Sequence, residues 1–280
     1  MANKVILVVL DGLNYQTANE CLGFVQALRK EGQATQYRMQ CELPSMSRPL
    51  YETILTGTRP AVNGIVNNQI TRLSNQTSIF SLAKQAGLTT AAAAYHWVSE
   101  LYNRTPYDPR RDRFTHDPSL TIPYGCFYHA DHYPDSHLLI DAEMLRRRHD
   151  PDFLLVHPMN IDDTGHRHGV DSSNYRNSAR HLDGELSHYL PTWIAAGYQI
   201  IITADHGMNA DRSHGGILPE ETEVPFITIG ERFSHDSALT PAQTDICGTI
   251  CELLEIAQHS KPVTQGLLTL PEVRHAVSYL

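Results

Sequence analysis

The sequence predicts an α/β fold with a doubly wound, mostly parallel central sheet flanked by helices. Three short runs of branched apolar residues have the length of buried strands, at residues 5–10, 153–157 and 199–204. Runs that are apolar on both faces are typical of parallel strands covered by helices on each side. Amphipathic stretches lie between these runs, the longest at residues 174–196. This alternation predicts consecutive βα units.

The predicted elements follow one another in chain order. After the first strand, residues 18–31 predict an amphipathic helix. A helix over residues 78–86 is followed by Gly87, which favours the left-handed conformation that ends a helix, and then by a strand over 89–94. Residues 100–137 break the rhythm because they are rich in Pro, Asp, Arg, His and Tyr. This stretch predicts a small loop-rich insert, which either borders a pocket or is an irregular surface excursion.

Composition narrows the class of protein. The chain has 280 residues, with 31 acidic against 22 basic side chains and a net charge of −9. This length suits one domain, residues 1–280, with the insert inside it. Such a charge argues against nucleic-acid binding, whereas a bound cation would still admit a small anionic substrate. We find neither a signal peptide nor the roughly 20 apolar residues of a membrane span. We therefore expect a cytoplasmic protein without a membrane partner.

The cysteines predict no special site, whereas the histidines do. The five cysteines are odd in number and form no CxxC pair, so neither a disulfide framework nor a closed zinc site is expected. Cys247 and Cys251 have the spacing of one helix face and are expected in the core. The 16 histidines are unusually many, and this excess predicts a functional site.

Side chains that can bind metals follow each predicted strand. Asp11 follows the first, Asp162 and His166 follow the second, and Asp205 and His206 follow the third. Because ligand groups gather at the carboxyl ends of parallel strands, we expect these side chains to meet. Mixed carboxylate and imidazole donors suit divalent first-row metals, with zinc first. Each residue alone also has an ordinary explanation as a turn, a helix cap or an i,i+4 pair, so the prediction depends on their joint occurrence.

These residues stand in motifs that resemble the alkaline phosphatase superfamily, and within it the type I phosphodiesterase/nucleotide pyrophosphatase family. The resemblance implies an alkaline-phosphatase-like fold and a two-metal-dependent hydrolase of phosphodiester or pyrophosphate bonds. Its motifs span nearly the whole chain and are VVLDGL (8–13), PSMSRPLYETILTG (44–57), NGIVNN (63–68), DDTGHRHG (162–169), TADHGMN (203–209), HGG (214–216) and TDICGTICELL (244–254).

The resemblance implies two divalent metal ions, with zinc the leading identity and manganese or iron compatible with the same donors. The side chains that would bind one ion are Asp162, His166 and His214. Those that would bind the other are Asp11, Asp205 and His206, together with the oxygen of Ser47.

The resemblance also implies the reacting groups. Ser47 matches the nucleophile, which would form a phospho-serine intermediate, because a metal ion activates a hydroxyl that is otherwise weakly nucleophilic. Asn68 matches an asparagine that hydrogen-bonds a phosphoryl oxygen. Arg48 replaces an aromatic residue and is a candidate contact for a substrate anion, although a surface arginine explains it equally well. The expected substrate is a small phosphate ester or a nucleotide-like molecule.

Alternative functions use the same metal core. They are a phosphomonoesterase, a phosphonate hydrolase and a sulfatase. The Ser47-Arg48-Pro49 sequence partly imitates the sulfatase pattern, but Tyr51 stands where that pattern has arginine. A non-catalytic binding protein on the same fold is the hypothesis least favoured, because the complete ligand set is present.

Overall fold

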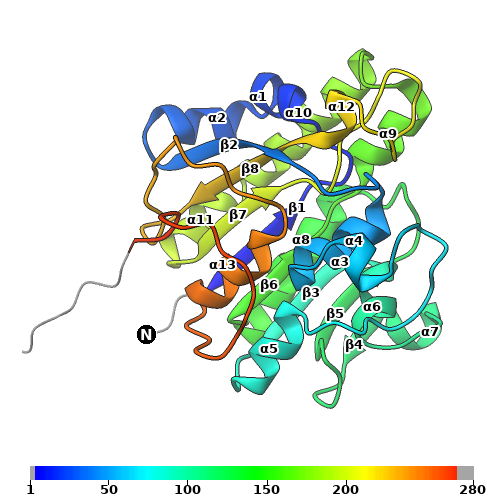
Figure 1. The fold of residues 1–280 in the computed structure, drawn as a ribbon, viewed down its shortest axis with the longest axis vertical. Helices are drawn as coiled ribbons and strands as arrows, with labels where there is room; N and C mark the ends of the chain where they lie inside the picture. Colours follow the sequence, from blue (N-terminus) through cyan, green and yellow to red (C-terminus); the bar gives the residue numbers. More distant parts are fainter. Residues whose placement is uncertain (1–3, 270–280) are drawn as a thin grey trace, which may run out of the picture.

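The computed structural model describes residues 4–269, and every strand in this part of the chain belongs to one sheet. The strands are β1 (Val5–Val9), β2 (Ala34–Gln40), β3 (Thr90–Tyr95), β4 (Phe114–His116), β5 (Tyr124–Tyr128), β6 (Phe153–Val156), β7 (Gln199–Thr203) and β8 (Glu223–Ile229). Their spatial order is β2-β8-β7-β1-β6-β3-β5-β4 (Figure 1).

The centre of the sheet is parallel and its margins are antiparallel. β1 pairs in parallel with β6 and β7, and β3 pairs in parallel with β6 and β5. β8 runs antiparallel to β7 and β2, and β4 runs antiparallel to β5. The predicted α/β fold with a mostly parallel sheet is therefore confirmed.

Helices cover both faces of the sheet. One group contains α1, α2, α8 and α10, and the other contains α3, α5, α6 and α13 (Figure 1). The helices are α1 (Tyr15–Cys21), α2 (Gly23–Lys30), α3 (Ser47–Thr56), α4 (Pro60–Asn63), α5 (Ile79–Gln85), α6 (His96–Tyr102), α7 (Pro109–Asp112), α8 (Asp135–His149), α9 (Asn160–His168), α10 (Ser173–Ser187), α11 (Leu190–Ala195), α12 (Pro219–Thr222) and α13 (Asp245–Leu253).

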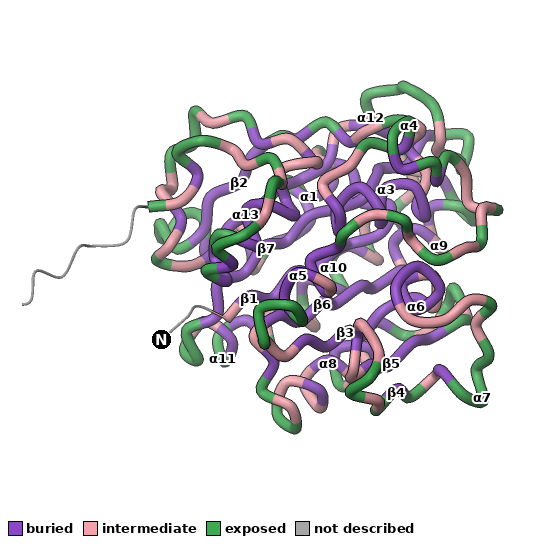
Figure 2. The backbone as a smooth tube through the Cα atoms, turned by 60° about the horizontal axis from the view of Figure 1, so that its bottom comes forward, coloured by how far each residue is buried: buried purple, intermediate pink, exposed green. Residues whose placement is uncertain are grey.

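The central strands are buried on both faces, as their apolar sequences predict. Every residue of β1, β3, β6 and β7 is buried (Figure 2). Branched side chains pack well on a pleated surface that lies between two helical layers. All five cysteines are free and buried. No helix in residues 4–269 is long and apolar enough to cross a membrane.

Three segments depart from the predicted boundaries. The helix expected over residues 18–31 is two helices, because Leu22 between α1 and α2 has non-helical dihedral angles. The stretch 174–196 is likewise divided between α10 and α11. The insert at residues 100–137 contains irregular chain but also contributes β4 and β5 to the sheet. The sequence did not predict β5, because this strand is short and its mixed aromatic residues lie between Pro-rich and charged segments.

Candidate active site

The topology brings the carboxyl ends of β1, β6 and β7 to one edge of the sheet, because these three strands are parallel neighbours. Asp11 lies just beyond β1, and Asp205 and His206 lie just beyond β7. β6 leads into α9, which presents Asp162 and His166 one helical turn apart. The predicted convergence of strand-end side chains is therefore observed.

Gly12, which follows Asp11 after β1, allows this part of the chain to approach α9 closely. Its φ is +73°, and a Cβ atom at this position would lie 2.8 Å from the Cα atom of Asp162. Glycine tolerates both the left-handed backbone and the short separation. The carboxylate that follows β1 and the carboxylate on α9 consequently share one site.

The deeper part of this site is an inner group composed of Asp11, Asp205 and His206. All three residues are 0% exposed. The Nε2 atom of His206 lies 3.5 Å from Oδ1 of Asp11 and 3.3 Å from Oδ2 of Asp205. These three atoms lie close enough together to bind one metal ion.

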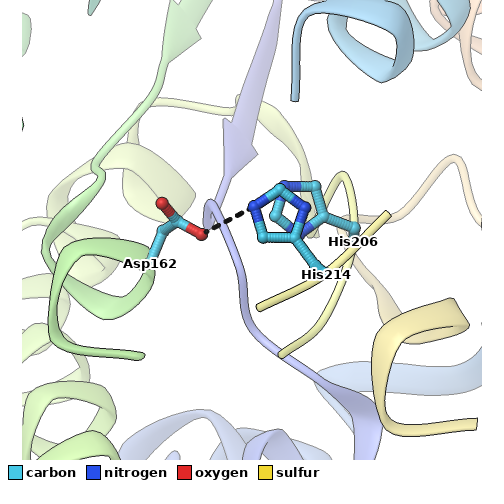
Figure 3. Close-up of side chains that lie close together, drawn as sticks. All are labelled: Asp162, His206 and His214. Atoms are coloured by element: carbon cyan, nitrogen blue, oxygen red, sulfur yellow. Dashed lines mark ion pairs between the residues drawn. The ribbon is translucent and has the colours of Figure 1, made fainter. Parts of the chain in front are cut away.

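The second part is an outer group composed of Asp162, His166 and His214. The His166 and His214 Nε2 atoms are 3.2 Å apart, and they lie 3.4 and 3.7 Å from the two carboxylate oxygens of Asp162. The His214 ring stacks on the His206 ring at 3.7 Å, so the two groups adjoin (Figure 3). Asp162, His206 and His214 each offer a ligand atom, and these atoms lie close enough together to hold one metal ion. Unlike the inner group, the outer group reaches solvent through His166, whose side chain is 45% exposed.

The three imidazoles have a common orientation. In each ring, Nδ1 donates to a backbone carbonyl oxygen and Nε2 faces the cluster, so the neutral form of each ring presents its Nε2 lone pair there. This is the arrangement that metal-binding histidines require. The pairs are His166 with the Arg212 carbonyl at 3.0 Å, His206 with the Gly207 carbonyl at 2.8 Å, and His214 with the Ser45 carbonyl at 2.7 Å.

The carboxylates show the same arrangement. Each has a buried oxygen that finds no hydrogen-bond partner among residues 4–269, namely Oδ1 of Asp11, Oδ1 of Asp162 and Oδ2 of Asp205. An unpaired buried carboxylate oxygen is costly unless a cation or donor compensates it. The donor set therefore fits divalent cations, because bare carboxylate oxygens and Nε2 lone pairs face one another.

The protonation behaviour of the carboxylates reflects an excess of negative charge. Burial, followed by the charge of Asp11, raises the pKa of Asp162. Burial and the charges of both neighbouring carboxylates raise the pKa of Asp205 well above its ordinary value. Burial also acts to raise the pKa of Asp11, but the His157 hydrogen bond and the His206 charge hold it at about 2. Carboxylates that oppose one another's ionisation form a site for a cation.

The histidines differ according to their exposure. Burial lowers the pKa of His206, and it lowers the pKa of His214 to about 4 with help from the neighbouring His206 charge. The hydrogen bond to Asp162 instead raises the pKa of His166 to about 9. His206 and His214 are thus neutral at pH 7, as metal ligands must be, whereas His166 has a proton to lose.

Ser47 lies at the first turn of α3 and faces the cluster. Its Oγ atom is 3.0 Å from Nε2 of His206, and the residue is 5% exposed. A helix N-terminus favours negative charge, so this position suits an oxygen that loses its proton. The Asn68 side-chain oxygen accepts the Arg48 backbone N–H at 3.0 Å. That bond directs the Asn68 amide oxygen to the helix and leaves its NH₂ group as the donor for another partner.

Arg48 does not join the cluster through its side chain. The residue is 2% exposed, its Nη2 atom lies 2.8 Å from Oε2 of Glu100, and its guanidinium lies 4.5 Å from the centre of the Trp97 ring. Among residues 4–269 no contact of this guanidinium with the metal-binding side chains is found. In this conformation Arg48 forms an ion pair with Glu100 on α6. The alternative explanation of Arg48 as a surface arginine is wrong, because the side chain is buried.

Sequence reasoning did not identify two residues that contact the cluster. Tyr51 donates its hydroxyl hydrogen to Oδ2 of Asp11, and His157 bonds the same oxygen at 3.1 Å. Tyr51 follows Ser47 by one helical turn, and this spacing was the available signal. His157 directly follows β6, at the same edge of the sheet at which Asp11 follows β1.

The sheet, the two helical layers and the motifs at one sheet edge define a protein with the alkaline phosphatase superfamily fold. The chain matches the type I phosphodiesterase / nucleotide pyrophosphatase family over residues 5–220, and it belongs to that family.

Curated relatives match most of this chain at low sequence identity. The human GPI ethanolamine phosphate transferase 2, catalytic subunit, is 21% identical over 266 residues, which cover 89% of this chain and 26% of the human protein. The Aspergillus fumigatus GPI ethanolamine phosphate transferase 2 is 21% identical over 292 residues, covering 96% of this chain and 35% of that protein. The chain therefore spans about a quarter to a third of the length of these relatives.

Two solved structures share the fold at low sequence identity. Murine ectonucleotide pyrophosphatase / phosphodiesterase 5 has a TM-score of 0.75 and 15% identity, covering 95% of this chain and 100% of that chain. An inactive form of that murine protein was solved in complex with AMP. The C-terminal periplasmic domain of EcEptC from Escherichia coli, in complex with Zn, has a TM-score of 0.64 and 13% identity, covering 90% and 82% of the two chains.

Proposed function

We propose that this protein cleaves phosphodiester or pyrophosphate bonds by transferring the phosphoryl group to Ser47, with two divalent cations bound by the inner and outer groups. The observation that carries the proposal is the convergence of unpaired Asp oxygens and His Nε2 atoms beside the Ser47 hydroxyl. The inner group would bind one cation and the outer group the other. Bound dications lower the pKa of a coordinated hydroxyl and neutralise the charge of a phosphoryl group.

The protein's own groups have separate tasks in this reaction. Ser47 loses its proton and its Oγ attacks phosphorus, while the bond from phosphorus to the leaving oxygen breaks. The positive end of α3 favours the developing negative charge on Oγ. The Asn68 NH₂ group donates to an equatorial phosphoryl oxygen and would stabilise its charge, which grows in the transition state. Attack by a second oxygen nucleophile then releases Ser47.

The identity of that second nucleophile separates two activities. Water gives a hydrolase, which is the preferred function. An alcohol gives a phosphoester transferase, and this second candidate is supported by relatives that are GPI ethanolamine phosphate transferases. The AMP complex of the murine relative supports a nucleotide-like substrate. Zinc is the preferred metal because the donors are carboxylates and imidazoles, and the solved EcEptC domain, which shares the fold, is a complex with Zn. The cytoplasmic location stays a prediction.

The test combines metal content with substrate choice. We expect purified protein to contain two dications per chain and to cleave bis-p-nitrophenyl phosphate and a nucleoside p-nitrophenyl phosphate faster than p-nitrophenyl phosphate or p-nitrophenyl sulfate. Preference for the monoester or the sulfate would contradict the diesterase proposal in favour of the corresponding alternative. Absence of both metal and turnover would favour a binding protein.

A parallel assay decides between hydrolysis and transfer. Bis-p-nitrophenyl phosphate is incubated with a primary alcohol, and the products are separated by mass. A hydrolase yields p-nitrophenyl phosphate whether or not the alcohol is present. A dominant mixed diester of the alcohol would establish the transferase instead.

A further inference from the structure

Asp11 is bound through one of its oxygens by two side chains that lie outside the metal-binding sets. The Tyr51 hydroxyl and the His157 Nε2 atom both contact Oδ2, and the His157 distance is 3.1 Å. The other oxygen, Oδ1, has no hydrogen-bond partner in the part of the chain that the structure describes, and it lies 3.5 Å from Nε2 of His206. Asp11, Tyr51 and His157 are all at most 3% exposed, so water does not compete for these bonds.

The direction of both hydrogen bonds is fixed by neighbouring groups. The Tyr95 backbone N–H donates to Nδ1 of His157 at 3.3 Å. Nδ1 is therefore an acceptor, and in the neutral ring the proton is on Nε2, which donates to Asp11. An ionised carboxylate only accepts, so the Tyr51 hydroxyl also donates. Two donors consequently point at the same oxygen of Asp11.

The two donors come from separate and well-packed elements. Tyr51 lies on α3, one turn beyond Ser47, and His157 follows β6. Their rings pack edge to face, with centres 4.6 Å apart. The helix that presents the candidate nucleophile therefore also restrains the carboxylate on which the inner group depends.

We propose that Tyr51 and His157 are positioning residues that keep Asp11 a one-oxygen ligand and thereby reserve a coordination position for Ser47. This inference rests on the proposed function. Oδ1 of Asp11, Oδ2 of Asp205 and Nε2 of His206 supply three protein donors. Catalytic zinc sites typically have three protein donors and one open position. If Oδ2 of Asp11 were free, the carboxylate could bind through both oxygens and fill that position.

The experiment compares Tyr51→Phe and His157→Ala with His157→Gln, whose amide can still donate from the position of Nε2. The matched control is Tyr102→Phe, which removes a buried tyrosine bond to a carboxylate, from Tyr102 to Oε2 of Glu52 at 2.7 Å, outside the cluster. Each full-length variant is loaded with Co²⁺, its visible spectrum is recorded, and kcat and KM are measured with bis-p-nitrophenyl phosphate. Co²⁺ absorbs strongly in four-coordinate sites and weakly at higher coordination number.

We expect Tyr51→Phe and His157→Ala to weaken the Co²⁺ absorption and to lower kcat by about 10- to 100-fold, a typical effect of losing an outer partner of a metal ligand. KM should change little. His157→Gln should retain most of the parent spectrum and kcat, and Tyr102→Phe should lower only the unfolding temperature. If His157→Ala fails to fold, Tyr51→Phe, which removes a donor to Asp11, is compared with His157→Gln, which keeps one.

Parent-like spectra and kcat in Tyr51→Phe and His157→Ala, with only a lower unfolding temperature, would overturn the inference and leave the proposed function intact. Loss of spectrum and kcat in His157→Gln equal to that in His157→Ala would also overturn it, because donation from the Nε2 position would then be irrelevant. A parent protein that binds no Co²⁺ and has no activity would overturn the proposed function itself.

Discussion

The inner and outer groups have the same kinds of donor but differ in how the protein surrounds them. Asp11, Asp205 and His206 are completely buried, and an oxygen of each carboxylate is held by a protein donor. In the outer group, the His166 side chain is 45% exposed and its Nδ1 bonds the carbonyl of an exposed residue, Arg212. The comparison indicates a preformed inner group beside Ser47 and a more solvent-accessible outer group.

This difference has a physical consequence for metal binding. Buried donors whose second atoms are already bonded lose little freedom when a cation binds, whereas an exposed side chain must be ordered and desolvated. We therefore expect the outer cation to exchange readily with solvent and the inner cation to be retained. The following changes test that asymmetry, in order of decreasing effect.

The largest expected effect follows removal of the nucleophile. Ser47→Ala should lower kcat on bis-p-nitrophenyl phosphate by on the order of 10⁴-fold or more, while both cations stay bound because six protein ligands remain. Metal content by mass spectrometry and steady-state kinetics measure the two properties. Ser99→Ala on α6 is the matched control, since Ser99 is also buried, at 1% exposed, but lies outside the site. Near-normal turnover in Ser47→Ala would show that the nucleophile assignment is wrong.

A ligand from each group sharpens the contrast. Asp205→Asn should abolish activity in a way that excess metal does not restore, because the inner site is sealed and needs its charge. His166→Gln should lower kcat by more than the roughly 10- to 100-fold that is typical of losing a side chain that hydrogen-bonds a metal ligand. Added Zn²⁺ should nevertheless restore a large part of the activity. Titration of activity against Zn²⁺, together with metal stoichiometry after dialysis against a chelator, distinguishes these outcomes. Equal recovery of both variants would contradict the asymmetry.

The outer group should make its own contribution to the pH dependence of metal binding. In the metal-free protein, the bond to Asp162 raises the pKa of His166 to about 9, so this ring is protonated at pH 7. A cation must displace that proton, so His166 should add about a tenfold rise in affinity per pH unit up to about pH 9. Isothermal titration of Zn²⁺ at several pH values measures this slope. In His166→Gln the slope should flatten, and an unchanged slope in that variant would assign the proton to another group.

The smallest expected effect concerns the contact between the two groups. Gly12→Ala should lower the free energy of unfolding by about 1–3 kcal/mol through backbone strain, with an added loss from the 2.8 Å approach to Asp162. Gly32→Ala is the matched control, because Gly32 has the same φ of +73° and no atom within 4 Å of its would-be Cβ. Thermal unfolding of both variants isolates the contact. If both lose equal stability, the close approach contributes nothing.

The sheet and its edge were predictable because the information is local. Runs such as Val5–Val9 are apolar on both faces, and Asp11 and Asp205 follow their strands directly. Once the strands are parallel, their ends must meet at one edge. The antiparallel margins were not predictable, because the short polar sequences of β2 and β4 do not reveal which strand each one pairs with.

The sequence by itself determined the fold class, the side chains gathered at the strand ends, and a serine in their motif. Tertiary structure alone decided which oxygen of Asp11 accepts the Tyr51 hydrogen bond, that Arg48 pairs with Glu100, and that the His166 side chain is exposed to solvent. The reason is that strand ends follow from hydrophobic pattern and chain direction, whereas hydrogen-bond partners and burial arise when segments 40 to 146 residues apart pack together.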